Sequence, residues 1–130
     1  MNKISPEVQT GTIGELLVQL RLLQYGVQAA PPIKDSGNDL IAVRGKTFRA
    51  TQVKATTGST YSKANLPDLY NILAVVHLVG NGKVVFLDKS RVFLIPKEDV
   101  DGLSTHVDRL EKYKLTKELV DKLFQSSEAT

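Results

Sequence analysis

Apolar residues recur at helical spacing near the start of the chain, between residues that suit the two ends of a helix. Ser5, Pro6 and Glu7 favour a helix start, because serine caps free N–H groups, proline fits the first position and an acid suits the first turn. Gly26 suits the left-handed conformation in which many helices end. We therefore predict a helix between these two points.

Two apolar stripes run along this predicted helix on opposite sides, the first of them expected to face the core. The first stripe consists of Ile13, Leu16, Leu17, Leu20 and Leu23, and the second of Glu15, Val18, Leu22 and Tyr25. A helix with two apolar sides is expected to pack against a sheet and against something else. Glu15 is the charged residue of the second stripe.

Alternating polar and apolar residues after Gly26 predict strands over residues 27–30, 39–44 and 47–55. Gly45 and Lys46 separate the last two strands and suit a two-residue type II′ turn, which needs glycine first. This turn fixes a register that pairs Arg44 with Thr47, Val43 with Phe48, Ile41 with Ala50, and Asp39 with Gln52. Because side chains two residues apart share a face, Lys54 is expected beside Gln52 and Asp39.

The rest of the chain predicts further short elements. A polar loop over residues 56–65 precedes a helical turn at 66–70, and strands are expected at 71–79, 83–87 and 91–95. An amphipathic helix over 116–124 ends the pattern. The predicted order is α-β-β-β-α-β-β-β-α in a single α/β or α+β domain spanning residues 1–130, with a mixed sheet flanked by helices.

Composition excludes several kinds of site. The chain has no cysteine and two histidines, so a thiolate zinc site, a cysteine nucleophile and a histidine-rich metal site are not expected. A metal here would need oxygen ligands. No apolar run reaches the ~20 residues of a membrane span, and the first residues lack a signal-peptide pattern. We expect a cytoplasmic protein with no membrane partner.

Positive charge gathers in the first part of the chain. The net charge is +3, but residues 1–96 carry 11 basic and 6 acidic residues, whereas residues 97–130 carry 6 basic and 8 acidic. Residues 40–67 contain no acid and five basic side chains, Arg44, Lys46, Arg49, Lys54 and Lys63. Such a hairpin could bind phosphates, and the alternative is a solvated hairpin that is basic without function.

The cluster at the open end of the hairpin suits a hard cation. A carboxylate and an amide oxygen, from Asp39 and Gln52, are ligands that Mg²⁺ accepts, and Lys54 could orient a water or stabilise charge on a phosphate. These groups together fit hydrolysis of a phosphodiester. The alternative is a surface strand with mixed polar residues.

Four short motifs carry a family resemblance: Gly11-Thr12-Ile13-Gly14-Glu15, Tyr25-Gly26-Val27, Asp35-Ser36-Gly37-Asn38-Asp39-Leu40 and Gln52-Val53-Lys54. In this order they resemble the PD-(D/E)XK nuclease superfamily, with glutamine where most members have an acid before the lysine. This variant is similar to homing endonucleases of bacterial introns, and the helix and first hairpin resemble Holliday-junction resolvases. The resemblance implies a restriction-endonuclease-like core over about residues 5–96, with residues 97–130 as an extension.

The resemblance also implies an active site. Glu15, Asp39, Gln52 and Lys54 are the expected catalytic residues. Mg²⁺, or Mn²⁺, would be bound by Asp39, Gln52, Glu15 and the backbone carbonyl of Val53, while Lys54 positions the attacking water. The expected substrate is double-stranded or branched DNA. Expected DNA contacts are Lys34, Ser36, Asn38, Arg44, Lys46, Arg49 and Lys63.

Two other functions remain open from the sequence. Gln52 removes a negative charge from the site, so the chain could bind nucleic acid without cutting it. Alternatively, the second apolar side of the first helix could be the interface of a non-nucleic-acid oligomeric interaction domain. A homodimer or homotetramer is expected for a nuclease as well, because two active sites are needed to cut both strands.

Overall fold

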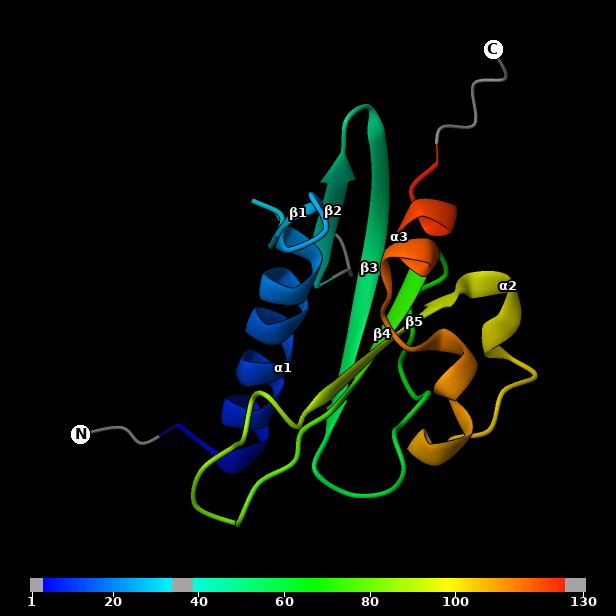
Figure 1. Cartoon of the computed structure of the whole chain (residues 1–130). Helices are drawn as coiled ribbons and strands as arrows, with labels where there is room; N and C mark the ends of the chain where they lie inside the picture. The colour runs from blue at the N-terminus through cyan, green and yellow to red at the C-terminus, as the bar shows by residue number, and fades with distance from the viewer. Residues whose placement is uncertain (1–3, 34–38, 126–130) are drawn as a thin grey trace.

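The first helix begins and ends where the sequence predicts. The computed structural model describes residues 4–33 and 39–125, and its first helix, α1, spans Pro6–Leu23 (Figure 1). The Ser5 side chain accepts a hydrogen bond from the Val8 N–H at 3.2 Å, which caps the first turn. Gly26 has a φ of 78°, the left-handed conformation expected after the helix.

A five-stranded mixed sheet forms the centre of the fold. Its strands lie in the order β1-β2-β3-β4-β5. Only β3 and β4 are parallel to each other, and the other neighbouring pairs are antiparallel. The strands are β1 Gln28–Ala30, β2 Leu40–Arg44, β3 Thr47–Thr56, β4 Ile72–His77 and β5 Arg91–Pro96. Helices flank this sheet, which confirms the predicted α+β fold class.

The β2–β3 hairpin has the predicted register. Arg44 pairs with Thr47 and Ile41 pairs with Ala50. Gly45 takes a φ of 61°, as the first residue of a type II′ turn requires. The hairpin therefore places alternate side chains of β2 and β3 on the faces expected from the sequence.

Two hydrophobic clusters cover the two faces of the sheet. On one face, α1 and the C-terminal helix α3, Lys117–Leu123, pack on alternate residues of the strands. The other face is covered by the loop around Tyr61 and Tyr70 and by the chain that follows β5 (Figure 1). That following chain contains α2 Lys97–Val100 and the 3-10 turns η1 Val107–Arg109 and η2 Glu111–Tyr113. The segment after residue 96 thus contributes to both clusters.

The predicted inner face of α1 is wrong for three of its five residues. Leu17 is buried and Ile13 is partly buried, but Leu16, Leu20 and Leu23 are exposed. Val18 and Leu22, assigned to the second stripe, are fully buried in the cluster instead. Two neighbouring rows of apolar residues run along α1 at the same spacing. The sheet packs against the row that contains Val18 and Leu22, and the row of Leu16, Leu20 and Leu23 faces outward.

Two predicted elements between β3 and β5 do not form. No strand lies at residues 83–87, where the Asn81 side chain accepts the N–H groups of Lys83 and Val84 and so occupies donors that a strand would need. The helical turn expected at 66–70 is an irregular segment, because Tyr70 inserts its ring into the second cluster. None of the described helices combines the length and apolar character needed to cross a bilayer.

Candidate functional site

Asp39 and Gln52 meet at the open end of the β2–β3 hairpin. Gln52 Nε2 donates to Asp39 Oδ2 at 3.0 Å, and the backbone N–H of Val53 donates to the same oxygen at 2.8 Å. The predicted facing of Asp39 and Gln52 is therefore present in the structure. These two hydrogen bonds fix the carboxylate against β3, just beyond the last residue pair of the two strands.

One atom of this cluster is buried without a hydrogen-bond partner, and that atom is Gln52 Oε1. A carboxylate can only accept, so the amide nitrogen must face Asp39 and the amide oxygen must point elsewhere. Gln52 is only 8% exposed. Leaving a buried acceptor unpaired costs about 1–3 kcal/mol, which is unusual away from functional sites.

The backbone of Val53 contributes a second oxygen at the same edge. The N–H and C=O groups of one strand residue point to the same side, and the Val53 N–H points to Asp39. Among the residues that the structure describes, pairing of β2 with β3 stops at Thr51, whereas β3 continues to Thr56. The Val53 carbonyl therefore points to the β2 side of β3, beyond the last residue pair described between the two strands.

Glu15 approaches the same edge from α1. Gly14 packs so tightly on β3 that a Cβ added there would lie 2.6 Å from the Ala55 Cβ. Glu15 is the next residue of α1, on the side of the sheet that this helix covers. Burial raises the pKa of the Glu15 carboxyl above its ordinary value, and the charge of Asp39 raises it further. The two carboxylates therefore repel each other across the open edge.

Lys54 lies on the predicted sheet face, but its ammonium makes a different contact. Its Nζ donates to the backbone carbonyl of Ala64 at 2.8 Å. Ala64 belongs to the loop that follows β3 and covers this face of the sheet. Lys54 is thus two residues from Gln52 on one face, with its charge directed to the loop.

The donor set fits a hard divalent cation. Among residues 4–33 and 39–125, no three His, Cys, Asp or Glu side chains gather into a ligand group. The cluster instead combines the carboxylates of Glu15 and Asp39 with the neutral oxygens of Gln52 and Val53. Oxygen ligands of this mixed kind suit Mg²⁺ or Mn²⁺, which retain several waters. Gln52 and Lys54 point to the face of the sheet opposite α1, because their pairing partners Leu73 and Val75 belong to the second cluster, whereas α1 packs on Ala55 from the first. A cation at the edge between the two faces would offset the repulsion between the Glu15 and Asp39 carboxylates.

Most of the predicted DNA-contacting cations in the described segments make contacts within the chain. Arg44 forms an ion pair with Asp121 at 2.6 Å, and Lys63 donates to the carbonyl of Leu103. Lys46 is exposed at the hairpin turn. Lys34, Ser36 and Asn38 lie outside the described residues.

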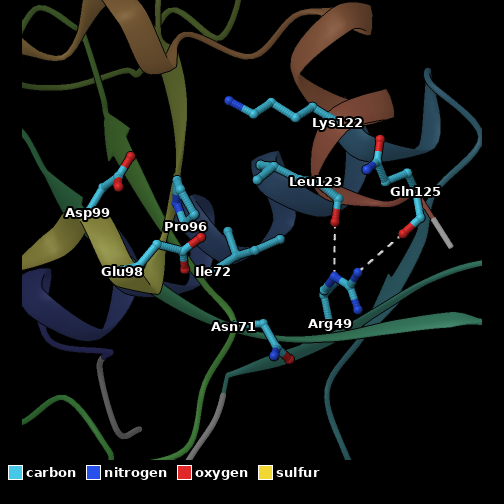
Figure 2. Close-up of a pocket in the computed structure, with 9 residues that line it drawn as sticks. All are labelled: Arg49, Asn71, Ile72, Pro96, Glu98, Asp99, Lys122, Leu123 and Gln125. Atoms are coloured by element: carbon cyan, nitrogen blue, oxygen red, sulfur yellow. Dashed lines mark hydrogen bonds between the residues drawn. The ribbon is translucent and has the colours of Figure 1, made fainter. Parts of the chain in front are cut away.

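Arg49 is also engaged with the C-terminal segment. Its guanidinium donates to the carbonyls of Leu123 at 2.9 Å and Gln125 at 3.4 Å (Figure 2). It lines a pocket of about 440 Å³ whose other side carries Glu98 and Asp99. The pocket also contains Lys122, so its two cations face two acids, and the hydrogen bonds of Arg49 fasten the end of α3 to β3.

Sequence reasoning missed two positions that shape the cluster. Gly14 was noted as part of a motif, yet its role is to let α1 approach β3 closely enough to deliver Glu15. A glycine inside an otherwise apolar helix is the signal that could have revealed it. The Ala64 carbonyl that binds Lys54 carries no such signal, because any residue provides a carbonyl.

Comparison with known proteins identifies the fold. No known family model matches the chain, and no curated protein matches its sequence. The solved structure of a bacterial homing endonuclease, I-Ssp6803I, matches with a TM-score of 0.66 and 13% sequence identity. The match covers 94% of this chain and 95% of that chain. Over nearly its whole length, the chain therefore has the nuclease-like fold of a bacterial homing endonuclease.

Proposed function

We propose that the chain is a Mg²⁺-dependent endodeoxyribonuclease that hydrolyses phosphodiester bonds in double-stranded or branched DNA. The observation that carries the proposal is the Asp39–Gln52 pair beside Glu15, with one buried amide oxygen that has no partner. Unpaired buried groups and repelling carboxylates reduce stability, and such arrangements concentrate at functional sites. The fold of a homing endonuclease supports the same class of activity.

Asp39, Gln52, Glu15 and the Val53 carbonyl would bind the cation, as Mg²⁺ or Mn²⁺. When bound, the cation polarises a phosphoryl oxygen and lowers the pKa of a coordinated water. Asp39 is oriented for this task by its hydrogen bonds from Gln52 and from the Val53 N–H. This anchoring keeps the carboxylate in one position before the substrate arrives.

Lys54 would orient the attacking water by donating a hydrogen bond to its oxygen. Its ammonium has three N–H donors, and one of them is used by the Ala64 carbonyl, so two remain for the water. A long flexible lysine can direct these donors by rotamer motion. DNA would be bound by the exposed Lys46 and by the segment containing Lys34, Ser36 and Asn38. Arg44, Arg49 and Lys63 would contribute where their present partners release them.

Two substitutions test the activity directly. Asp39→Asn keeps the shape of the side chain and removes its charge, and Lys54→Met keeps the chain length and removes the ammonium. We expect Asp39→Asn to abolish Mg²⁺-dependent cleavage of plasmid and branched DNA. Lys54→Met should slow it about 10²- to 10⁴-fold, the usual contribution of a group that positions or transfers a proton.

The matched control is Asp88→Asn, which removes a carboxylate from an exposed turn away from the cluster. It should cleave at the wild-type rate, and all variants should give wild-type circular dichroism spectra. Full cleavage by folded Asp39→Asn protein would refute the proposed site.

A protein that binds DNA without cutting it is the second candidate. Two observations favour it: a neutral Gln52 stands in the cluster, and Lys54 is occupied by a loop carbonyl. This function predicts binding that weakens steeply with salt, persists in EDTA, and yields no cleavage with Mg²⁺ or Mn²⁺. Cleavage by wild-type protein that is lost in Asp39→Asn excludes it.

A further inference from the structure

The loop after β3 forms a compact turn where it meets Lys54. The Ser62 hydroxyl accepts the N–H of Ala64 at 3.0 Å, which closes the turn locally. Asn65 follows in the left-handed conformation, with a φ of 60°. In the part of the chain that the structure describes, it is the one residue other than glycine with a positive φ. The Ala64 carbonyl that accepts from Lys54 Nζ therefore belongs to a turn with a defined backbone.

This turn is fastened to the chain that follows β5. On its N-terminal side, Tyr61 is buried and donates to the backbone carbonyls of residues 104–105, from its hydroxyl at 2.9 Å and from its N–H at 3.0 Å. Within the turn, Lys63 donates to the carbonyl of Leu103. On its C-terminal side, Leu66 packs against the second cluster. The turn is thus held in one place over the sheet face to which the lysine of β3 points.

A lysine bound to such a turn differs from a lysine in free solvent. Its four-carbon stem is flexible, and ordering it at the moment of reaction costs entropy. The Ala64 carbonyl already uses one N–H of Lys54, so the directions of the other two N–H groups follow from the first. The contact therefore orders the ammonium before a substrate arrives.

We propose that the turn over residues 62–65 positions the Lys54 ammonium for the attacking water, and that Asn65 is a positioning residue for this reaction. The inference rests on the proposed nuclease function and extends it to a residue outside the Asp39–Gln52 cluster. The Ala64 carbonyl belongs to the peptide unit that precedes Asn65, so the φ of Asn65 sets its direction relative to the chain that follows. Asparagine and glycine accept a positive φ, whereas a β-branched residue strongly disfavours it.

Steady-state cleavage of plasmid DNA with Mg²⁺ tests this role. Asn65→Val should lower kcat about 10- to 100-fold with KM unchanged, because it misplaces a reacting group and leaves DNA binding intact. Asn65→Gly retains the left-handed conformation and should cleave as the wild type does. The matched control is Asn81→Val, the same change in an exposed turn between β4 and β5, and it should also keep the wild-type kcat. Wild-type cleavage by folded Asn65→Val protein overturns the proposal.

A double-mutant cycle tests whether Asn65 acts through Lys54. In Lys54→Met protein the ammonium is absent, so adding Asn65→Val should cause no further loss of kcat. A turn with only a structural role would instead slow both backgrounds by the same factor, and that result overturns the proposal. Circular dichroism verifies that each variant is folded.

Chemical labelling tests the contact without any cleavage. Lysines are acetylated with a succinimidyl ester, and mass spectrometry gives the rate at each one. Lys54 should react more slowly than the exposed Lys46 in the wild type and in Asn65→Gly. In Asn65→Val its rate should rise toward that of Lys46. An unchanged rate in Asn65→Val overturns the proposal, whereas a wild type that protects Lys54 without cleaving DNA refutes the nuclease function and leaves the positioning of the ammonium by the turn supported.

Discussion

The two ends of the β2–β3 hairpin use their polar groups in opposite ways. At the turn end, Arg44 pairs with Asp121 and Arg49 donates to the carbonyls of Leu123 and Gln125. At the open end, Gln52 keeps an unpaired buried oxygen and Asp39 lies near a second carboxylate. The same two strands therefore satisfy polar groups at one end and leave them unsatisfied at the other.

The turn end of the hairpin thus stabilises the fold, and the open end carries the proposed chemistry. The turn end fastens the last part of the chain to the sheet, and its interactions need nothing beyond the protein. The open end has groups that a cation and a substrate would complete, at some expense of stability. Substitutions confined to one end of the hairpin therefore assign each effect to one of the two roles.

The largest effect is expected from moving α1 away from the open end. Gly14→Ala would place a Cβ 2.6 Å from the Ala55 Cβ, so the helix or the strand must shift. Overpacking of this kind costs about 1–3 kcal/mol, partly offset by the better helix propensity of alanine. We expect lower stability in urea denaturation and slower cleavage, because Glu15 moves with the helix.

Gly11→Ala is the matched control on the same helix. No atom lies within 4 Å of a Cβ built at Gly11, so alanine should raise stability by about 0.5–1 kcal/mol. Opposite signs for the two substitutions would assign the loss to the contact with Ala55. Equal stabilisation by both would show that Gly14 does not control the position of Glu15.

The sequence predicted the hairpin well because its signals are local. Gly45 sets the turn, and alternation along β2 and β3 fixes the register. The proximity of Asp39 to Gln52 could therefore be predicted from the sequence. The α1 face could not be chosen in the same way, since Leu16, Leu17 and Val18 all belong to apolar rows. Which row is buried depends on packing against β3, and that contact lies far away in the sequence.

The candidate site was predictable as a set of residues but not as a geometry. Asp39 and Gln52 are adjacent through hairpin pairing, whereas Glu15 joins them through the Gly14–Ala55 contact. The contact of Lys54 with a loop carbonyl depends on a long irregular segment, for which the sequence offers no periodic signal. The engagement of Arg49 with α3 likewise depends on the tail, which the family resemblance did not cover.

A second prediction restores an acid at the open end. Gln52→Glu would replace an amide donor by a third carboxylate next to Asp39 and Glu15. Without metal, the variant should be less stable than the wild type, because the hydrogen bond from Gln52 Nε2 is lost and repulsion is added. Its Mg²⁺ affinity should rise about tenfold in isothermal titration calorimetry, equivalent to about 1.4 kcal/mol. Gln28→Glu, on exposed β1, should change neither property.

A third prediction removes the repulsion instead. Glu15→Gln should make the protein slightly more stable in EDTA, by less than about 1 kcal/mol because solvent screens a carboxylate that is only partly buried. In Mg²⁺ the variant should instead be less stable than the wild type, since it lacks one of the proposed metal ligands. Thermal melting of both proteins with EDTA and with Mg²⁺ measures the two differences. A variant less stable than the wild type in EDTA would contradict the proposed repulsion.

The pH dependence of the same pair of proteins gives a fourth prediction. The pKa of Glu15 is raised in the folded protein above its ordinary value of 4.5, so the folded state binds more protons between the two values. The stability advantage of Glu15→Gln in EDTA should therefore be complete above the folded pKa, shrink through this window, and vanish below 4.5. Urea denaturation at several pH values measures it, and an advantage that persists at pH values below that window would exclude titration of Glu15 as its cause.

The smallest effect is expected at the turn end, from Lys46. Arg44 and Arg49 have partners in the C-terminal segment, whereas Lys46 is exposed at the turn and can contact a phosphate without losing a contact given by the structure. Lys46→Ala should lower DNA affinity less than about tenfold and reduce the slope of log K against log salt by about 1. Fluorescence anisotropy over a salt series measures both, with Lys89→Ala, an exposed cation on the β4–β5 connection, as the control. If the slope is unchanged in Lys46→Ala, the turn end does not contact DNA. Its role would then be to stabilise the fold, and other segments would contact DNA.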